Sequence, residues 1–349
     1  MDRVAVFTPV DRQALFRETA ARMGIASAVI AEKDFWVCWT LKGLFGLADP
    51  PSLLFKGGTS LSKAFGLIDR FSEDIDLSFN RADLGFGGEK DPILIRGTKA
   101  RRRKIEALAA ACRSAVCDRV HPALEARFRD VLGDENWSLE IAERADGQVD
   151  LQFHYPISLE AGDYGRLEYI RPMVRLEIGA RSDHHPSERL KIRSFAAEQF
   201  PEQFAEAGCE VVTLAPERTF WEKATILHHE SHRPVREGEQ PAAWKQMSRH
   251  CYDLAMMAKR GMAERALGRM DLLEQVARHK KAFYYTGWSH YDEATTGALH
   301  LSPSGALGAA LRRDYAEMQP MFFGDPPSFD EILAILADLE GRVNLRRSG

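Results

Sequence analysis

The chain has 349 residues, of which 45% are hydrophobic and 28% are charged, and its formal net charge is −4. This balance is ordinary for a soluble globular protein, and the length allows a large core and two domains. The net charge excludes the global basic field that is typical of many nucleic-acid-binding proteins, but a local basic patch is enough to bind RNA.

Cysteine usage and apolar runs indicate the compartment. The five cysteines form no Cys-x-x-Cys pair, so neither a disulfide framework nor a cysteine-based zinc site is expected. The N-terminus lacks a charged and then apolar leader, and no apolar run reaches membrane-spanning length. We therefore expect a cytoplasmic protein that does not associate with a membrane.

In chain order, the first predicted elements are two helices, over residues 11–23 and 27–47. The first is amphipathic. The second contains Glu32-Lys33-Asp34 followed by aromatic residues at helical spacing. This spacing favours a core helix over a cofactor-binding segment.

A glycine-rich turn follows in residues 53–79, which read LLFKGGTSLSKAFGLIDRFSEDIDLSF. A short apolar strand leads into Gly57-Gly58, where backbone amides can approach an anion closely. Thr59-Ser60 supply hydroxyls and are placed to cap a helix expected over residues 61–68. A helix N-terminus with free N–H groups binds phosphate, so the turn is a candidate phosphate site.

Two carboxylates end the same stretch. Polar and apolar residues alternate in DIDLSF, which puts Asp74 and Asp76 on one face of a strand, about 7 Å apart. Their repulsion is relieved when a cation lies between them, and Mg²⁺ takes oxygen ligands of this kind. Either signal alone favours a capped helix and a solvated strand. The two together favour a nucleoside-triphosphate enzyme.

GGTSLSK followed by RFSEDIDLSF resembles the signature of the AbiEii/AbiGii-type nucleotidyltransferase toxins. These proteins belong to the DNA-polymerase-β-like superfamily and are the toxin halves of type IV toxin–antitoxin systems. The gap between Gly58 and Asp74 is longer than in many superfamily members. The EKDFW segment also resembles the N-terminal helix of this family, so Lys33 or Asp34 is a candidate for orienting the active-site loop.

A basic run opens the next helix, which is expected over residues 97–130. Residues 99–104 contain five cations in six positions. They form either a solvated helical face or a landing site for the phosphates of a nucleic-acid acceptor. No aromatic residue interleaves the cations, so base stacking is not indicated.

Three strands are then expected, over residues 137–142, 149–155 and 173–179. The resemblance implies a third carboxylate on a strand beside the Asp-x-Asp strand, completing a site for two Mg²⁺ ions. Asp150 and Glu177 are the candidates. VRLEIG resembles the acidic strand of the family, so Glu177 is chosen, while an exposed structural carboxylate stays an alternative for either residue.

A helix that begins at Pro216 follows a short strand over residues 211–214. Its buried stripe is expected to contain Phe220, Ala224 and Leu227. TFWEKATILH resembles the second motif of the family, which implies that Lys223 holds the triphosphate. HHESH further along lacks the HExxH order of a zinc hydrolase, so no zinc site is expected.

The helix that contains SRHCYDL resembles the third motif of the family, with His250-Cys251 where a Lys-Asp pair is common. Arg249 and Asp253 remain and share a helical face. The resemblance implies that Arg249 meets phosphate and that Asp253 fixes Lys223 or a substrate group. A purely structural pair between Arg249 and Asp253 is the alternative.

These patterns predict an α/β fold: a polymerase-β-like core with a small mixed sheet over residues 1–214, including the N-terminal helices. A mainly helical domain over residues 215–349 contributes Lys223 and Asp253. The implied function is Mg²⁺-dependent transfer of a nucleotide from an NTP to an acceptor such as the 3′ end of tRNA, in a toxin with a cognate antitoxin. The alternatives are a non-catalytic NTP-binding module, against which the intact Asp-x-Asp argues, and a phosphodiesterase, against which the glycine turn argues.

Overall fold

The computed structural model describes residues 1–25, 27–49, 52–164, 170–236 and 239–345. The chain forms two compact units. The N-terminal unit comprises Met1–Ala64 and Phe71–Leu214, and the C-terminal unit comprises Phe65–Arg70 and Ala215–Gly349. The functional division expected at residue 214, with a nucleotidyltransferase core followed by a contributing domain, stays a prediction.

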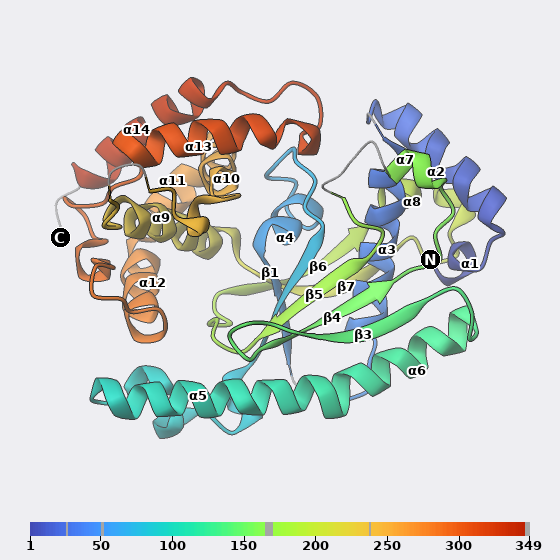
Figure 1. Cartoon of the computed structure of the whole chain (residues 1–349), viewed down its shortest axis with the longest axis horizontal. Coiled ribbons are helices and arrows are strands. Elements are labelled where there is room, and N and C mark those ends of the chain that lie inside the picture. The colour runs from blue at the N-terminus through green and yellow to red at the C-terminus, as the bar shows by residue number, and fades with distance from the viewer. Residues whose placement is uncertain (26, 50–51, 165–169, 237–238, 346–349) are drawn as a thin grey trace. The chain divides into compact units, whose positions relative to one another are not determined.

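A seven-stranded mixed sheet organises the N-terminal unit, with the strand order β3-β4-β5-β2-β1-β7-β6 (Figure 1). β2 pairs with β5, and β1 with β7, in parallel, and the other neighbours are antiparallel. This mixed sheet confirms the α/β fold class. The strands are β1 (Leu53–Lys56), β2 (Asp74–Phe79), β3 (Ser138–Glu143), β4 (Val149–His154), β5 (Val174–Gly179), β6 (Ser187–Arg193) and β7 (Gly208–Leu214).

Helices cover the apolar face of this sheet. Phe153 of β4 lies on the same face as Ile75 and Leu77 of β2, as the register of β4, β5 and β2 shows. Its ring centroid is 5.7 Å from that of Trp39 and 4.5 Å from that of Phe128. The helices of this unit are α1 (Asp2–Ala5), α2 (Pro9–Met23), α3 (Ala28–Phe45), α4 (Gly57–Lys63), α5 (Thr98–Ala115), α6 (His121–Leu132), α7 (Ala161–Tyr164) and α8 (Phe195–Gln199). Trp39 belongs to α3 and Phe128 to α6, so these two helices pack on the apolar face. Asp74 and Asp76 alternate with Ile75 and Leu77 and therefore lie on the opposite, polar face.

One expectation about local structure is wrong, and one strand was missed. The helix expected over residues 61–68 is α4, which begins at Gly57 and ends at Lys63, so Thr59 and Ser60 lie inside it and do not cap it. The chain can enter the helix directly from β1 because Gly57 has a φ of +78°. β6 was not expected, because its sequence SERLKIR is highly charged. It pairs with β7 at the edge of the sheet, where charged side chains are common.

The C-terminal unit is built from helices, as expected for this part of the chain. Phe220, Ala224 and Leu227 of α9 are buried, which confirms the expected stripe. Among the described residues, no helix combines the length and the apolar character that a membrane span requires. The helices are α9 (Pro216–Ser231), α10 (Ser248–Lys259), α11 (Met262–Leu267), α12 (Met270–Phe283), α13 (Gly305–Glu317) and α14 (Phe329–Asn344).

Candidate active site

Carboxylates from three neighbouring strands form a row on the polar face of the sheet. Asp76 of β2 lies directly opposite Glu177 of β5, and Glu177 lies opposite Asp150 of β4. Asp74 is two residues before Asp76 and shares its face. Both candidates for the third carboxylate therefore lie in the row. Glu177 is the immediate neighbour of Asp76, and Asp150 is one strand further away.

Burial and neighbouring charge raise the pKa values of two carboxylates in the row, Asp74 and Glu177. Burial raises the pKa of Asp74 to about 6, and the charges of Glu73 and Asp76 act in the same direction. Burial also raises the pKa of Glu177, and the charges of Asp76 and Asp74 add to this effect. A group of carboxylates whose charged forms are disfavoured in this way is stabilised by a bound cation.

Arginines accompany the outer part of the row. Arg144 lies 3.5 Å from Asp150 and 3.6 Å from Glu177, measured between its Nη1 atom and a carboxylate oxygen of each residue. Arg175 lies 3.7 Å from Glu177. Among the described residues, Oδ1 of Asp150 and Nε of Arg175 are buried without a hydrogen-bond partner. Oδ1 of Asp150 therefore has an ion-pair neighbour, Arg144, but no hydrogen bond.

The glycine turn lies against the same carboxylates. A Cβ atom added to Gly57 would be 2.0 Å from Oδ2 of Asp76, so only glycine fits this position. Ser60 is buried and donates its hydroxyl proton to the carbonyl oxygen of Gly57, at 2.9 Å. Thr59 is also buried and donates to the carbonyl oxygen of Asp74, at 2.5 Å. Both hydroxyls therefore hold the turn and β2 together.

Helix α3 anchors both parts of this arrangement. Lys33 is buried, contacts the carboxylate of Glu73 and donates to the carbonyl oxygen of Arg171 at 2.9 Å. Asp34 accepts a hydrogen bond from Lys63, the last residue of α4, at 2.8 Å. Because Glu73 directly precedes Asp74, Lys33 fixes the start of β2, while Asp34 fixes the end of α4. These contacts support the orienting role considered for the two residues.

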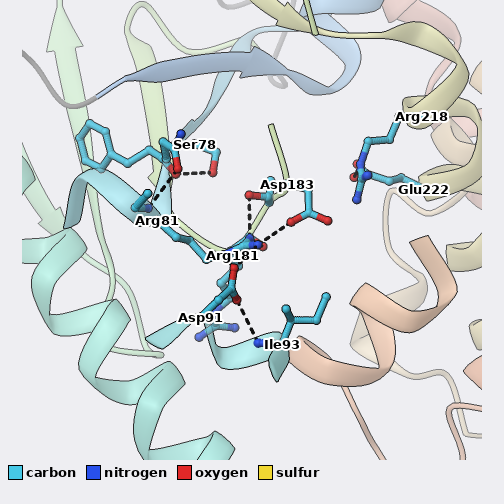
Figure 2. Close-up of polar contacts among 12 residues, drawn as sticks. Ser78, Arg81, Asp91, Ile93, Arg181, Asp183, Arg218 and Glu222 are labelled. Carbon is cyan, nitrogen blue, oxygen red and sulfur yellow. Dashed lines mark hydrogen bonds and ion pairs between the residues drawn. The ribbon is translucent and has the colours of Figure 1, made fainter. Parts of the chain in front are cut away.

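Arg81 anchors the other end of β2 (Figure 2). It contacts the carboxylates of Asp91, at 3.0 Å, and Asp183, at 2.5 Å. It also donates to the carbonyl oxygens of Arg181 and Ser182, at 3.1 and 3.0 Å. The segment that contains these acceptors follows β5, so Arg81 helps to hold β2 and β5 in the register that pairs Asp76 with Glu177.

In the C-terminal unit, Asp253 of α10 holds two cations. Its carboxylate accepts two hydrogen bonds from Arg70, at 2.7 and 2.8 Å, and lies 2.7 Å from Nζ of Lys223. Burial by itself would raise the pKa of Asp253, but the charges and hydrogen bonds of Arg70 and Lys223 outweigh it and hold the pKa well below its usual range. Arg249, one helical turn before Asp253, is half-buried.

Some residues in these arrangements were not singled out from the sequence. Lys223, a substrate group and Arg249 were considered as partners of Asp253, whereas Arg70 was not considered. Arg70 and Glu73 both belong to the RFSED segment. The signal that could have pointed to Arg70 is its position as a charged residue between the apolar residues Ile68 and Phe71. Its partner lies 183 residues further along the chain, a distance at which sequence periodicity carries no information.

Comparison with known proteins identifies the family. A family model described as "Nucleotidyl transferase AbiEii toxin, Type IV TA system" matches residues 40–335. Among solved structures, the nucleotidyltransferase toxin MenT4 from Mycobacterium tuberculosis H37Rv is similar, with 18% identity and a TM-score of 0.44 over 96% of this chain and 99% of that chain. No curated protein matches the chain significantly. Because the family model spans most of its length, the chain belongs to the AbiEii family of nucleotidyltransferase toxins of type IV toxin–antitoxin systems.

Proposed function

We propose that this nucleotidyltransferase transfers a nucleoside monophosphate from an NTP to an acceptor hydroxyl at the carboxylate row. One observation carries the proposal: the strand register places Glu177 beside Asp76, and the Gly57 turn lies against the same Asp76 carboxylate. Carboxylates for a metal and a glycine turn for phosphates are thus adjacent in one unit. Nucleotidyl transfer needs these two kinds of group side by side.

The row fits Mg²⁺. Its carboxylate oxygens are the ligands that this ion prefers, and burial together with like charge disfavours the ionised forms of Asp74 and Glu177 when no cation compensates them. Asp74, Asp76 and Glu177 would hold two ions. When bound, the ions would neutralise charge on the transferred phosphate and lower the pKa of the acceptor hydroxyl.

The residues of the chain then position the reactants. The acceptor oxygen forms a bond to the α-phosphorus, the bond from that phosphorus to the bridging oxygen breaks, and pyrophosphate leaves. Glu177 is the proposed acceptor for the proton of the hydroxyl, because it lies beside Asp76 in the row. The backbone N–H groups of Gly57, Gly58, Thr59 and Ser60 hold the phosphates. Fixed charges and dipoles of this kind act without reorganising during the reaction.

Lys223 and Arg249 supply positive charge for the triphosphate in this proposal. An ammonium group has three N–H donors, and Asp253 takes one of those of Lys223. Asp253 thereby fixes the direction of the side chain. Arg249 adds a guanidinium that can grip phosphate oxygens in a bidentate manner.

We further propose that the acceptor is a nucleic acid such as the 3′ end of tRNA, and that a cognate antitoxin binds the protein. The basic start of α5 supports a nucleic-acid acceptor, because Arg102 is 81% exposed and its neighbours Arg101, Arg103 and Lys104 are also cationic. Exposed cations of this kind bind phosphates irrespective of base sequence. The antitoxin is supported by the family to which the chain belongs.

The test incubates the wild-type protein and Asp74→Ala with total tRNA and each α-³²P-labelled NTP. We expect labelled tRNA with the wild type and a loss of at least about 100-fold with Asp74→Ala. Asp134→Ala, which removes an aspartate that is 81% exposed, is the control and should keep full transfer. Unchanged labelling by a folded Asp74→Ala rejects the proposal, as does NTP binding without transfer or RNA cleavage without NTP.

A further inference from the structure

Histidine rings gather where α9 ends, in the C-terminal unit. The ring centroid of His232 lies 4.6 Å from that of His228, 4.4 Å from that of His290 and 5.2 Å from that of His300. Glu293 joins the group, with Oε1 3.0 Å from Nδ1 of His290. We propose that His232, His290 and Glu293 bind a divalent transition-metal ion such as Zn²⁺.

The distances suit one ion. One ligand atom from each of His232, His290 and Glu293 lies within 4.8 Å of the others. Ligands that are each about 2.0–2.1 Å from a zinc ion lie at most about 4 Å apart, so the group has only a short distance to close. The side chains of His290 and Glu293 are 41% and 57% exposed, and rotation about their exposed bonds supplies that movement.

The hydrogen bonds of His232 leave one of its nitrogens available. Its Nδ1 lies 2.8 Å from the carbonyl oxygen of His228. A carbonyl oxygen only accepts, so Nδ1 carries the proton and Nε2 keeps its lone pair. A metal-binding histidine typically donates its other N–H to a carbonyl or a carboxylate in this manner, which fixes the ring and its tautomer.

His228 supports the proposed ligands through hydrogen bonds to the backbone. Its Nε2 donates to the carbonyl oxygen of His290, at 3.0 Å, and its Nδ1 accepts from the backbone N–H of His300, at 3.1 Å. Both ring nitrogens are therefore used, so His228 supports the ligands and is not counted among them. This buried histidine ties the segment of His290 to α9 in the arrangement that brings His290 and His232 together.

The donor set selects the kind of ion. Two imidazoles and one carboxylate match the ligands of zinc and similar transition metals, whereas Mg²⁺ prefers an all-oxygen shell. The ion would join His232, which follows the last residue of α9, to Glu293 of the short helix Tyr291–Glu293. Because both segments belong to the C-terminal unit, binding should stabilise that unit.

The test uses the full chain, stripped with EDTA and returned to excess Mg²⁺, which competes with zinc at the proposed carboxylate site. Calorimetric titration with ZnCl₂ should show one bound equivalent, and CoCl₂ should give the visible absorption bands of nitrogen-ligated cobalt. Zinc should also raise the Tm. His290→Asn and Glu293→Gln should each weaken zinc binding at least about tenfold and reduce the rise in Tm.

Asparagine is chosen for position 290 because the residue there has a φ of +47°, which asparagine tolerates. His154→Asn is the matched control, since His154 is 43% exposed and lies in the N-terminal unit, and it should bind zinc as the wild type does. A wild type that binds no zinc in excess Mg²⁺ overturns the proposal. So does either ligand variant with unchanged zinc affinity, or an equal loss of affinity in the control.

Discussion

At the scale of single residues, the close approach of Gly57 to Asp76 decides which residue fits at position 57 of the candidate site. Gly57 has a φ of +78°, and its Cα lies so close to the carboxylate of Asp76 that a methyl group has no room. Asp76 is also 3.8 Å from Nζ of Lys56, on the strand that leads into the turn. The glycine therefore serves the backbone conformation and the position of a carboxylate at the same time.

Gly57→Ala should displace either the turn or Asp76. The added Cβ would lie 2.0 Å from Oδ2 of Asp76, so we expect a loss of about 2–3 kcal/mol in the free energy of unfolding, at the upper end of the range for backbone strain. Nucleotide transfer should fall at least about tenfold, because a carboxylate in the row moves. Chemical denaturation and the labelled-NTP assay measure the two effects.

Gly147→Ala is the matched control for this variant. Gly147 has a φ of +77°, and an added Cβ would have no atom within 4 Å among the described residues. It should therefore lose only about 1–2 kcal/mol from the left-handed backbone conformation and should keep its transfer activity. Equal stability and equal activity of the two variants would show that the contact with Asp76 is unimportant.

At the scale of elements, α3 is a buried helix that carries charges. Glu32, Lys33 and Asp34 are all buried, and each has partners of opposite charge or hydrogen-bonding groups. Lys33 meets the start of β2 and Asp34 meets the end of α4, so one helix fixes the two elements that supply the carboxylates and the glycine turn. Buried ion pairs of this kind add little net stability, but they cost much when one partner is removed.

Lys33→Met should leave Glu73 without its partner. Because the side chains of Lys33 and Glu73 are 3% and 19% exposed, we expect a loss of about 2–4 kcal/mol in the free energy of unfolding. Transfer activity should also fall, since Asp74 follows Glu73 directly. The double variant Lys33→Met/Glu73→Gln should regain part of the lost stability, because no unpaired charge remains.

Arg129→Ala is the control for a pair at the surface. Arg129 is 52% exposed and contacts Glu125 and Asp134, so its removal should cost less than about 1 kcal/mol. If Lys33→Met proves no more costly than Arg129→Ala in urea denaturation, the anchoring role of α3 is wrong.

At the scale of the whole molecule, the chain passes between its two compact units three times. Phe65–Arg70 leaves the N-terminal unit between α4 and β2 and groups with the C-terminal unit, which the chain joins again at Ala215. Arg70 ends this segment and pairs with Asp253, whose carboxylate also contacts Lys223. The fold of the C-terminal unit therefore depends on six residues that lie inside the glycine and carboxylate motif of the other unit.

Asp253→Asn should destabilise the protein in a pH-dependent way. The folded state holds the pKa of Asp253 well below the value of an unfolded chain, so this carboxylate contributes stability above about pH 4 and loses it as the pH falls through the folded-state pKa. At neutral pH the variant removes the anion that the buried cations Arg70 and Lys223 share, and we expect a loss of about 3–5 kcal/mol. Urea unfolding at a series of pH values measures the difference.

Two results would contradict this view of Asp253. One is a wild-type-like stability of the variant at neutral pH, and the other is a difference that grows as the solution becomes more acidic. Asp271→Asn breaks an ion pair with Arg269 in which both side chains are about half exposed, so it should cost less than about 1 kcal/mol.

Much of the fold and of the carboxylate site could be predicted from local patterns. The alternation in DIDLSF correctly placed Asp74 and Asp76 on one polar face, because residues two apart on a strand always share a face. The boundaries of α4 were not predictable, because they depend on how Gly57 packs against Asp76. β6 was missed because an edge strand can be almost as charged as a loop.

The sequence by itself determined the α/β class, the glycine turn followed by two carboxylates, and the family. All three can be predicted from neighbouring residues and their spacing in the sequence. Only the tertiary structure decided that Glu177 lies beside Asp76, that Arg70 holds Asp253, and that His228 ties His290, 62 residues away, into a cluster of histidines. These contacts join residues far apart in the chain, and they form because the core brings the backbone segments together, which no local periodicity encodes.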